Sequence, residues 1–343
     1  MPSPPPLNGP FRIIGVDSSP YTTKLRAVFR YRHIEHVWQC RMPQFFEETQ
    51  HVRPGLMPVL ADGDGNYLTD STPLILALES TGDQERRVLP DDHGRAFVAA
   101  LIEDMADEWL TKVLFYYRFK ATEAGRHAAG WVSDDTLVDA SREALSAATT
   151  SFHARQLERL PIVGATDAHA DLLDSTLTRI LSALEGAVAN ERFLFGTRPS
   201  LADFGLIAQL STLERDWAGS AVMRASAPRT EAWTRRGTDL SGVTGAWGDE
   251  PMADNRCVMA LLKLTGEIYL PYLDANATAL ASGRDHFTTK LAGHEYGQAP
   301  FRYQAKCLRE LRQRYQALSA QTRARIGPAL DATDCLPLLE RSV

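Results

Sequence analysis

The sequence predicts an α/β domain at the N-terminus followed by an all-α region. Three observations predict this class. Short runs rich in β-branched and aromatic residues alternate with a helical pattern only near the start of the chain. Beyond it, apolar residues recur at helical spacing almost to the end. The length of 343 residues, with 44% hydrophobic and 23% charged side chains, suits a globular chain of two or three domains.

The first part of the chain has the order β-α-β. The run FRIIGV (11–16) reads as a buried strand. Pro20 then stands where the first turn of a helix would begin, and proline is tolerated there because its missing N–H would have no partner anyway. A second strand is predicted over 34–40. Residues 41–52 are predicted to form a short helix or an irregular loop.

A hairpin and a helix complete this domain in the order β-β-α. MPVLA (57–61) reads as a strand, DGDGN as a turn of residues that tolerate positive φ, and NYLT (66–69) as the partner strand. Ser71 is predicted to cap a helix, because serine oxygens accept hydrogen bonds from the first N–H groups of helices. The apolar face of this helix includes Leu74, Ile75 and Leu78.

The remaining chain is predicted to be helical, with two boundaries. Loss of periodicity marks a linker, and a Gly- and Trp-containing stretch near 237–248 marks the second boundary. Pro271 is expected to end or kink a helix. The predicted helices cover 95–120, 136–160, 169–189, 200–213, 252–270 and 300–319. The predicted organisation is a disordered Pro-rich tail (1–10), the α/β domain (11–81), the linker (82–94), an all-helical domain (95–240) and a C-terminal helical extension (241–343).

Composition excludes several function classes. The formal net charge of −6 argues against a nucleic-acid partner, which would call for a basic surface. No apolar run approaches the ~18 residues of a membrane helix, and the start of the chain lacks the basic and apolar regions of a signal peptide. The cysteines stand singly, without metal-ligand spacing, which predicts no metal site and a reduced, cytoplasmic protein with buried, inert thiols. They are Cys40, Cys257, Cys307 and Cys335.

Four motifs, in this order, carry a resemblance. SPYT follows the first strand, LMPVL forms the third, TDS opens the last helix of the α/β domain, and FLFGTRPSLADFGLIAQL holds Ser200 and Asp203 in a capping-box arrangement. Over residues 10–235 the chain resembles the glutathione S-transferases. The resemblance implies a thioredoxin-like N-terminal domain, an all-helical domain, glutathione as co-substrate and a homodimer.

The resemblance implies that Ser19 stabilises the thiolate of glutathione. The N–H groups and dipole at a helix start favour an anion, and a serine hydroxyl can donate to a thiolate and lower its pKa. The alternative is that Ser19 is only an N-cap. Ser18, Tyr21 and Thr22 compete for the same donor role.

The resemblance also implies a binding surface for the glutathione backbone. Met57–Pro58 matches a cis-proline turn whose exposed backbone pairs with the cysteinyl group; the alternative is a trans proline on an edge strand. Asp70 and Ser71 match the pair that holds the γ-glutamyl group, although Ser71 could equally serve only as a helix cap.

The chain departs from the family pattern at the position that would bind the glycyl carboxylate of glutathione. Gln50, His51 and Arg53 all compete for this contact. Arg53 is favoured because its planar fork of donors suits a carboxylate.

The segment EDMADEWLTKVLFYYRFK (103–120) is interpreted in two ways. Its acids are expected to form a solvated face, and no neighbouring histidine completes a metal site: Glu103, Asp104, Asp107 and Glu108. In the resembling family this helix lines the pocket of the electrophile, which implies an aromatic pocket of Trp109, Tyr116 and Tyr117 for a small apolar substrate.

The predicted function is therefore glutathione transfer to a small hydrophobic electrophile. Two alternatives stay open: a non-catalytic binding or interaction protein that keeps the fold, and a glutathione-dependent isomerase or dehalogenase. The extension could form a lid, an interface or a packing buttress, and its amphipathic helices favour packing onto the core.

Overall fold

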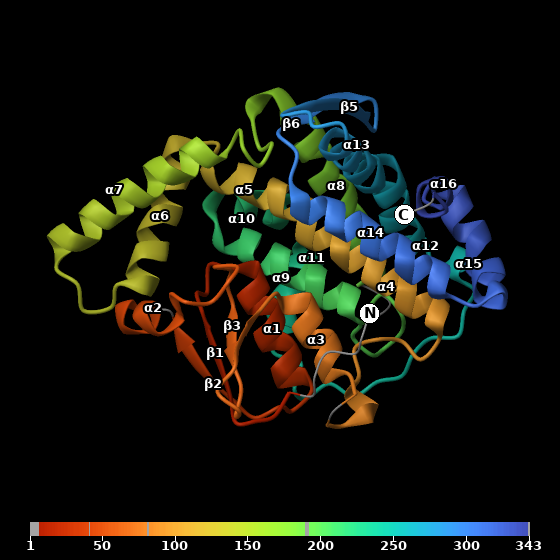
Figure 1. Cartoon of the computed structure of the whole chain (residues 1–343), viewed down its shortest axis with the longest axis horizontal. Helices are drawn as coiled ribbons and strands as arrows, with labels where there is room; N and C mark the ends of the chain where they lie inside the picture. The colour runs from red at the N-terminus through yellow and green to blue at the C-terminus, as the bar shows by residue number, and fades with distance from the viewer. Residues whose placement is uncertain (1–6, 41, 81, 189–191, 342–343) are drawn as a thin grey trace.

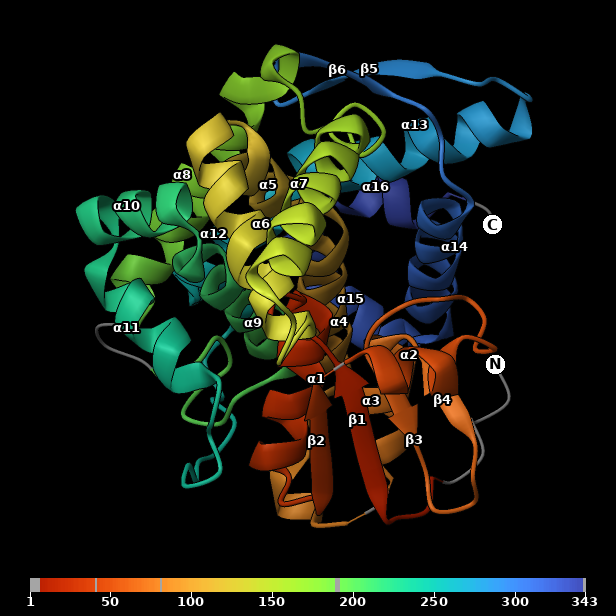
Figure 2. The same cartoon turned by 90° about the vertical axis from the view of Figure 1, so that its left-hand side faces the viewer.

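The computed structural model describes residues 7–40, 42–80, 82–188 and 192–341. The N-terminal domain contains one sheet in the order β2-β1-β3-β4, with β1 parallel to β2 and antiparallel to β3, and β3 antiparallel to β4. Figure 2 shows this domain below a larger helical body. The elements are β1 (Phe11–Gly15), α1 (Pro20–Tyr31), β2 (His36–Cys40), α2 (Pro43–Thr49), β3 (Val59–Ala61), β4 (Tyr67–Thr69) and α3 (Ser71–Leu78). This is the thioredoxin-like arrangement that the resemblance implied.

Alternation along the strands builds two cores. Ile13 of β1 lies opposite Leu60 of β3, and both are buried in the main core with Phe29 of α1. Their neighbours Ile14 and Val59 point to the other face and form a small second core. Successive side chains of a strand face opposite sides of its sheet, so each strand contributes to both cores.

Helices form the rest of the chain, with short 3₁₀ turns and two π-turns (Figure 1). The central region contains η1 (Gln84–Arg86), α4 (His93–Met105), the π-turn η2 (Ala106–Leu110), α5 (Thr111–Phe119), α6 (Thr122–Thr136), α7 (Arg142–Arg159), η3 (Asp167–His169), α8 (Ala170–Ala187), α9 (Leu201–Arg215), α10 (Trp217–Ser226) and α11 (Pro228–Gly237). The extension contains η4 (Met252–Asp254), α12 (Arg256–Leu264), the π-turn η5 (Thr265–Tyr269), α13 (Leu270–Ala281), β5 (Phe287–Leu291), β6 (His294–Gln298), α14 (Arg302–Ala317), α15 (Ala320–Ala332) and α16 (Leu336–Leu339).

Three details of the predicted organisation differ. The extension contains the hairpin β5–β6, which the helical prediction missed. Pro271 does not end a helix but lies in the first turn of α13, where proline is tolerated. Of the predicted disordered tail, residues 1–6 lie outside the described residues, whereas Leu7 is buried in the main core.

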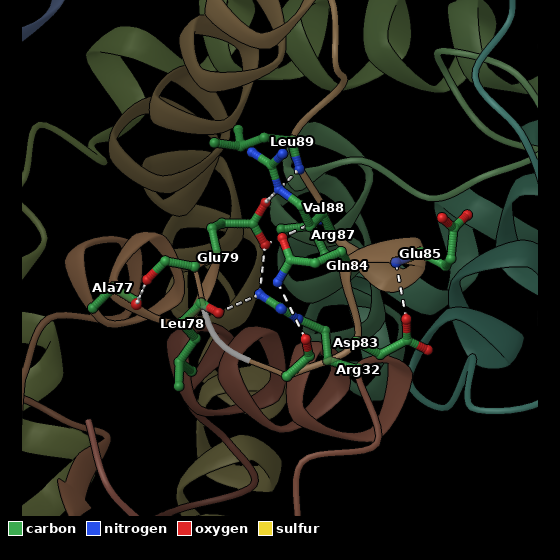
Figure 3. A network of polar contacts seen from close by, with 12 residues as sticks. Arg32, Ala77, Leu78, Glu79, Asp83, Gln84, Glu85, Arg87, Val88 and Leu89 are labelled. Carbon is green, nitrogen blue, oxygen red and sulfur yellow. Dashed lines mark hydrogen bonds and ion pairs between the residues drawn. The ribbon is translucent and has the colours of Figure 1, made fainter. Parts of the chain in front are cut away.

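The linker is fixed by a buried ion pair (Figure 3). The Arg32 guanidinium donates to Glu79 Oε1 at 2.7 Å and to the carbonyl oxygen of Leu78 at 2.7 Å. The Glu79 carboxylate also accepts from the N–H groups of Val88, at 3.1 Å, and Leu89, at 3.0 Å. One carboxylate therefore joins α1, the end of α3 and the linker.

The extension packs onto the helical body. Helix α14 runs along α4 in Figure 1, and Leu261, Leu308 and Leu330 of the extension are buried in the main core. None of the helices in the described ranges is long and apolar enough to cross a membrane.

A complete capping box opens α9. Asp203 is fully buried and accepts from the N–H groups of Leu194, at 2.9 Å, and Ser200, at 2.8 Å, and from the Ser200 hydroxyl at 2.6 Å. Asp203→Ala would leave buried donors without acceptors, so we expect a loss of about 2–4 kcal/mol in unfolding free energy, measured by urea denaturation. Ser141→Ala, which removes a simple exposed cap from α7, should cost about 1 kcal/mol or less. Equal losses for the two variants would contradict this role of Asp203.

Candidate functional site

The turn after β1 places Ser19 at the start of α1. Ser19 has extended backbone angles, and its Oγ accepts from the N–H of Thr22 at 3.4 Å. Pro20 follows in the first turn. Because the oxygen acts as the acceptor in this cap, the hydroxyl hydrogen can still be donated to a ligand. An N-cap serine and a hydroxyl that stabilises an anion are therefore compatible roles in this geometry.

The structure separates the four competing hydroxyl groups. Ser18 and Ser19 line one cavity. Tyr21 lines a different cavity, and its hydroxyl donates to the carbonyl oxygen of Asp107 at 3.0 Å. Thr22 is fully buried and lines neither of these cavities. Ser18 and Ser19 thus remain as candidates for contact with a thiolate.

The cavity beside Ser19, here called the serine cavity, has a volume of about 710 Å³. It lies between the turn after β1 and the pair of helices α6 and α7. Its wall is largely apolar, with two arginines at one side. The lining includes Phe46, Val132, Leu137, Phe152, Arg155 and Arg159.

A second cavity, here called the acidic cavity, has a volume of about 390 Å³. Met57 lines both cavities and therefore stands where they meet. The Met57–Pro58 peptide bond is cis, as predicted. The acidic cavity is lined by Tyr21, Pro54, Leu56, Met57, Asp70, Ser71, Asp107, Glu108, Tyr303 and Gln304.

Asp70 and Ser71 lie at the start of α3 and face the acidic cavity. Asp70, not Ser71, is the N-cap residue, so the predicted cap was wrong by one position. Asp70 has φ of 77°, and its carboxylate does not bond to the helix start. Its Oδ2 instead accepts from the Tyr303 hydroxyl of α14 at 2.9 Å and lies 3.8 Å from the Lys306 ammonium.

Arg53 is not brought to either cavity. Its guanidinium donates to the carbonyl oxygens of Gln50, at 2.5 Å, and Val52, at 3.0 Å, within its own loop. The ring of His51 packs against Tyr67. The described geometry therefore does not select any of the three candidates for a glycyl carboxylate.

The acids of α4 and η2 do not form a solvated face, so that prediction was wrong. Glu103 is 1% exposed and Asp107 is 6% exposed. The reason is Lys24 of α1, which is fully buried and forms ion pairs with Glu103, at 2.6 Å, and with Asp107. Lys24 also donates to Thr72 at 2.9 Å, so the cluster joins α1, α3 and α4.

Burial perturbs the proton affinity of this cluster. Burial raises the pKa of Asp104 to about 7, although a hydrogen bond from the Tyr269 hydroxyl acts in the opposite direction. Burial also raises the pKa of Asp107 to about 7, although the charge of Lys24 lowers it. Burial and the neighbouring acids raise the pKa of Glu108 to about 8. Such perturbed acids beside a cavity often belong to functional sites. Across the described ranges, no group of three or more His, Cys, Asp or Glu side chains is placed to hold a metal ion.

The three aromatic residues expected around the electrophile line neither of these two cavities, and the expected pocket stays a prediction. Trp109 is 1% exposed, and its indole nitrogen donates to Thr176 of α8 at 3.4 Å. Tyr116 and Tyr117 donate to Asp167 and Asp174, which lie in η3 and α8. All three residues belong to the buried main core, and Trp109 lies within the π-turn η2.

The sequence prediction kept a lid among the possible roles of the extension but named no residue of α14. Tyr303 and Gln304 line the acidic cavity, and Gln304 donates to Glu108 at 2.7 Å. The sequence signal was the mixture of aromatic and basic residues over 294–315. Such a local mixture does not show that this segment contacts Asp70 and Glu108, which lie about 200 residues earlier in the chain.

Comparison with protein families agrees with this geometry. The model of the glutathione S-transferase N-terminal domain matches residues 13–86, and that of the C-terminal domain matches residues 167–236. The chain belongs to a glutathione S-transferase-like family. The matched regions contain the Ser19 turn, Met57–Pro58 and the Asp70–Ser71 pair, whereas α12 to α16 lie beyond them.

Solved structures similar to this chain share little sequence with it. The Tau-class glutathione S-transferase from mango is 16% identical, with a TM-score of 0.41, covering 66% of this chain and 87% of that protein. The beta-etherase LigF from Sphingobium is 19% identical, with a TM-score of 0.45 and coverage of 66% and 93%. A Methylobacillus flagellatus glutathione S-transferase with glutathione bound is 17% identical, with a TM-score of 0.40 and coverage of 67% and 98%. No curated protein matches the sequence.

Proposed function

We propose that this chain is a glutathione transferase that joins the glutathione thiolate to a small hydrophobic electrophile. The observation that carries the proposal is the meeting of two cavities at Met57. One cavity presents the Ser19 hydroxyl at a helix start, and the other presents Asp70 and Ser71. A glutathione molecule across Met57 would place its γ-glutamyl group in the acidic cavity and its sulfur at Ser19.

In this proposal, the protein supplies electrostatics and position. The Ser19 hydroxyl donates to the sulfur, and the start of α1 favours its negative charge, so the thiol loses its proton to solvent more readily. The sulfur then forms a bond to an electrophilic carbon, and the leaving group departs with its electron pair. Holding both reactants at adjacent positions lowers the entropic cost of their encounter.

The electrophile would occupy the serine cavity and not a pocket of Trp109, Tyr116 and Tyr117. The apolar side chains of Phe46, Val132 and Phe152 line that cavity next to Ser19. Burial of apolar surface there would provide the affinity.

Ser19→Ala tests the catalytic assignment. Because the hydroxyl contacts only the sulfur in this proposal, glutathione affinity should stay within about threefold, while turnover of an activated aryl chloride should fall roughly 10- to 100-fold. Calorimetry measures the first quantity, and steady-state kinetics with a spectroscopic titration of the bound thiol measures the second. Ser18→Ala is the matched comparison, since Ser18 lines the same cavity.

Three results would count against the proposal. Absence of glutathione binding by the unmodified chain would favour a non-catalytic interaction protein. Unchanged turnover in Ser19→Ala with a loss in Ser18→Ala would transfer the role to Ser18. Binding without transfer, together with isomerisation or dehalogenation of suitable substrates, would favour the remaining alternative.

A cytoplasmic homodimer is part of the same proposal. The absence of cysteine pairs supports a reduced compartment: three of the four thiols are buried and none is in a disulfide. Sedimentation equilibrium of the full chain measures the oligomeric state. A monomer at all concentrations would contradict the homodimer.

A further inference from the structure

Helices α6 and α7 form an arm beside the serine cavity. The arm projects from the helical body on the side of α2 (Figure 1), and the lining of the cavity takes Phe46 from α2, Val132 from α6 and Phe152 from α7. The arm spans residues 122–159, which lie outside both regions matched by the family models. The family match therefore assigns no role to this wall of the cavity, and its own side chains decide what it binds.

Two arginines stand on the cavity side of α7. Arg155 and Arg159 both line the cavity and are four residues apart, so they are neighbours on one face of the helix. The guanidinium carbon of Arg155 lies 5.4 Å from the centre of the Phe152 ring, which also belongs to the lining. A cation–π contact of this kind holds the charge against an apolar wall. Both charges thus border the same space as the Ser19 hydroxyl.

No acid balances these two charges. The lining of the serine cavity contains no aspartate or glutamate. Within the described ranges, neither the Arg155 nor the Arg159 guanidinium forms an ion pair with a carboxylate. Like charges one helical turn apart repel each other. An anionic group bound between the two arginines would remove this repulsion and accept hydrogen bonds from both.

Gln156 adds a neutral polar group to the same wall. It lies between the two arginines in the sequence, lines the cavity and is 4% exposed. In α7, all of which the structure describes, it is the one buried residue. Ligand pockets typically combine an apolar wall with a few polar groups that fix the orientation of the ligand. The serine cavity has this composition, with two cations and one amide on α7 facing an apolar lining.

We propose that the arm makes this chain selective for electrophiles that carry a carboxylate on an apolar body, with Arg155 and Arg159 binding the carboxylate. The inference rests on the proposed function and narrows its substrate class from hydrophobic electrophiles to amphiphilic acids. The planar fork of a guanidinium donates paired N–H groups that match a carboxylate. The apolar body lies against Phe152, and its reactive carbon faces the sulfur at Ser19. The sulfur bonds to this carbon, the leaving group departs with its electron pair, and the carboxylate takes no part in the step.

Binding of an unreactive acid tests the arginine pair without any transfer step. The probes are dinitrobenzoate and dinitrobenzamide, which share an aromatic ring and differ in charge, and calorimetry of the full chain without glutathione gives the ratio of their affinities. Arg155→Gln and Arg159→Gln should each lower this ratio about three- to tenfold, because each removes a charged hydrogen-bond donor. Arg142→Gln is the matched control, since Arg142 is an exposed arginine of α7 outside the lining, and should leave the ratio within about twofold. Arg155 and Arg159 are themselves exposed, so their variants should fold normally.

Steady-state kinetics with glutathione extends the test to the transfer reaction. The substrates are chlorodinitrobenzoate and chlorodinitrobenzamide, from which the thiolate displaces chloride, and the measured quantity is the ratio of their kcat/KM values. Their intrinsic reactivities differ by the same factor in every variant, so this factor cancels when variants are compared. Arg155→Gln and Arg159→Gln should lower the ratio about three- to tenfold each, and added salt should lower it in the unmodified chain because it screens the exposed charges.

The outcomes distinguish this inference from the proposed function. If the unmodified chain fails to bind glutathione, the proposed function is wrong and the substrate class is wrong with it. If the chain binds glutathione but both ratios are unchanged in the double variant of Arg155 and Arg159, the arginine site alone is wrong. Weaker glutathione binding by these variants with unchanged ratios would also overturn the site, because the arginines would then hold the glycyl carboxylate of glutathione.

Discussion

Replacing Lys24 with methionine is expected to lower the free energy of unfolding by about 3–5 kcal/mol at neutral pH. Lys24 is fully buried and is the cation that pairs with Glu103, at 2.6 Å, and with Asp107. Methionine occupies a similar volume, so the packing is retained and the lost charge dominates. Without the ammonium, two buried carboxylates would have to take up protons or admit water.

Urea denaturation of Lys24→Met at several pH values measures this effect. The loss should shrink as the pH falls below about 7, because burial raises the pKa of Asp107 to about 7 and a protonated acid no longer needs a cation. Lys263→Met is the control: this lysine is partly exposed and pairs with Asp334 at 2.5 Å, and its removal should cost about 1 kcal/mol or less. Similar losses for the two variants would show that the buried cluster does not stabilise the fold.

The parts of the fold that could be predicted depend on short-range signals. The strand, turn and Pro20 at the start of α1 lie within about ten residues of one another, and so do the hairpin β3–β4 and the capping box of Ser200 and Asp203. For the same reason Ser18 and Ser19 could be named as neighbours of a helix start. Which hydroxyl faces the cavity depends on packing, and a helical pattern alone does not contain that information.

The predictions that failed concern residues whose surroundings are set by contacts between distant segments of the chain. The acids of α4 are buried because Lys24, 79 residues before Glu103, neutralises them. Tyr303 meets Asp70 across 233 residues. Neither pairing has a local signal. The run of acids was therefore interpreted as a solvated face, and the role of the extension stayed open between a lid, an interface and a packing buttress.

Two other failures have local causes. A helical pattern assumes 3.6 residues per turn, and the π-turn Ala106–Leu110 breaks that period, so the stretch predicted as one helix over 95–120 is interrupted. The hairpin β5–β6 has a turn at Ala292 and Gly293 with φ of 46° and 87°. The dipeptide Ala-Gly is a weak turn signal, and only its glycine marked the position.

The second large effect is a pH-dependent stability that originates in the buried acids. The pKa of Asp104 is raised from 3.8 to about 7, mainly by burial, with the acidic neighbour Glu103 adding to the shift. The Tyr269 hydroxyl, Arg314 and Lys24 act in the opposite direction. Between these two pKa values the folded chain holds a proton that the unfolded chain has released. The contribution of Asp104 to stability is therefore complete below about pH 4 and is lost as the pH rises through about 7.

Asp104→Asn isolates this contribution, because asparagine resembles the protonated acid and does not titrate. Relative to the unmodified chain, the variant should gain about 1–3 kcal/mol in unfolding free energy as the pH rises from about 5 to 8. Urea denaturation at intervals of pH, without glutathione, measures the difference. Glu108→Gln should also gain unfolding free energy relative to the unmodified chain as the pH rises, but over a higher pH range, since the pKa of Glu108 is raised to about 8.

Asp62→Asn gives the opposite case. Hydrogen bonds from Asn66, Asp64 and Gly65 outweigh the effect of burial and lower the pKa of Asp62, so this carboxylate is ionised in both states across the measured range. Replacing Asp62 with asparagine should therefore lower the unfolding free energy by the same amount at every pH of the series. If the Asp104→Asn difference were equally constant, Asp104 would be ionised in the folded chain throughout, and burial would not raise its pKa.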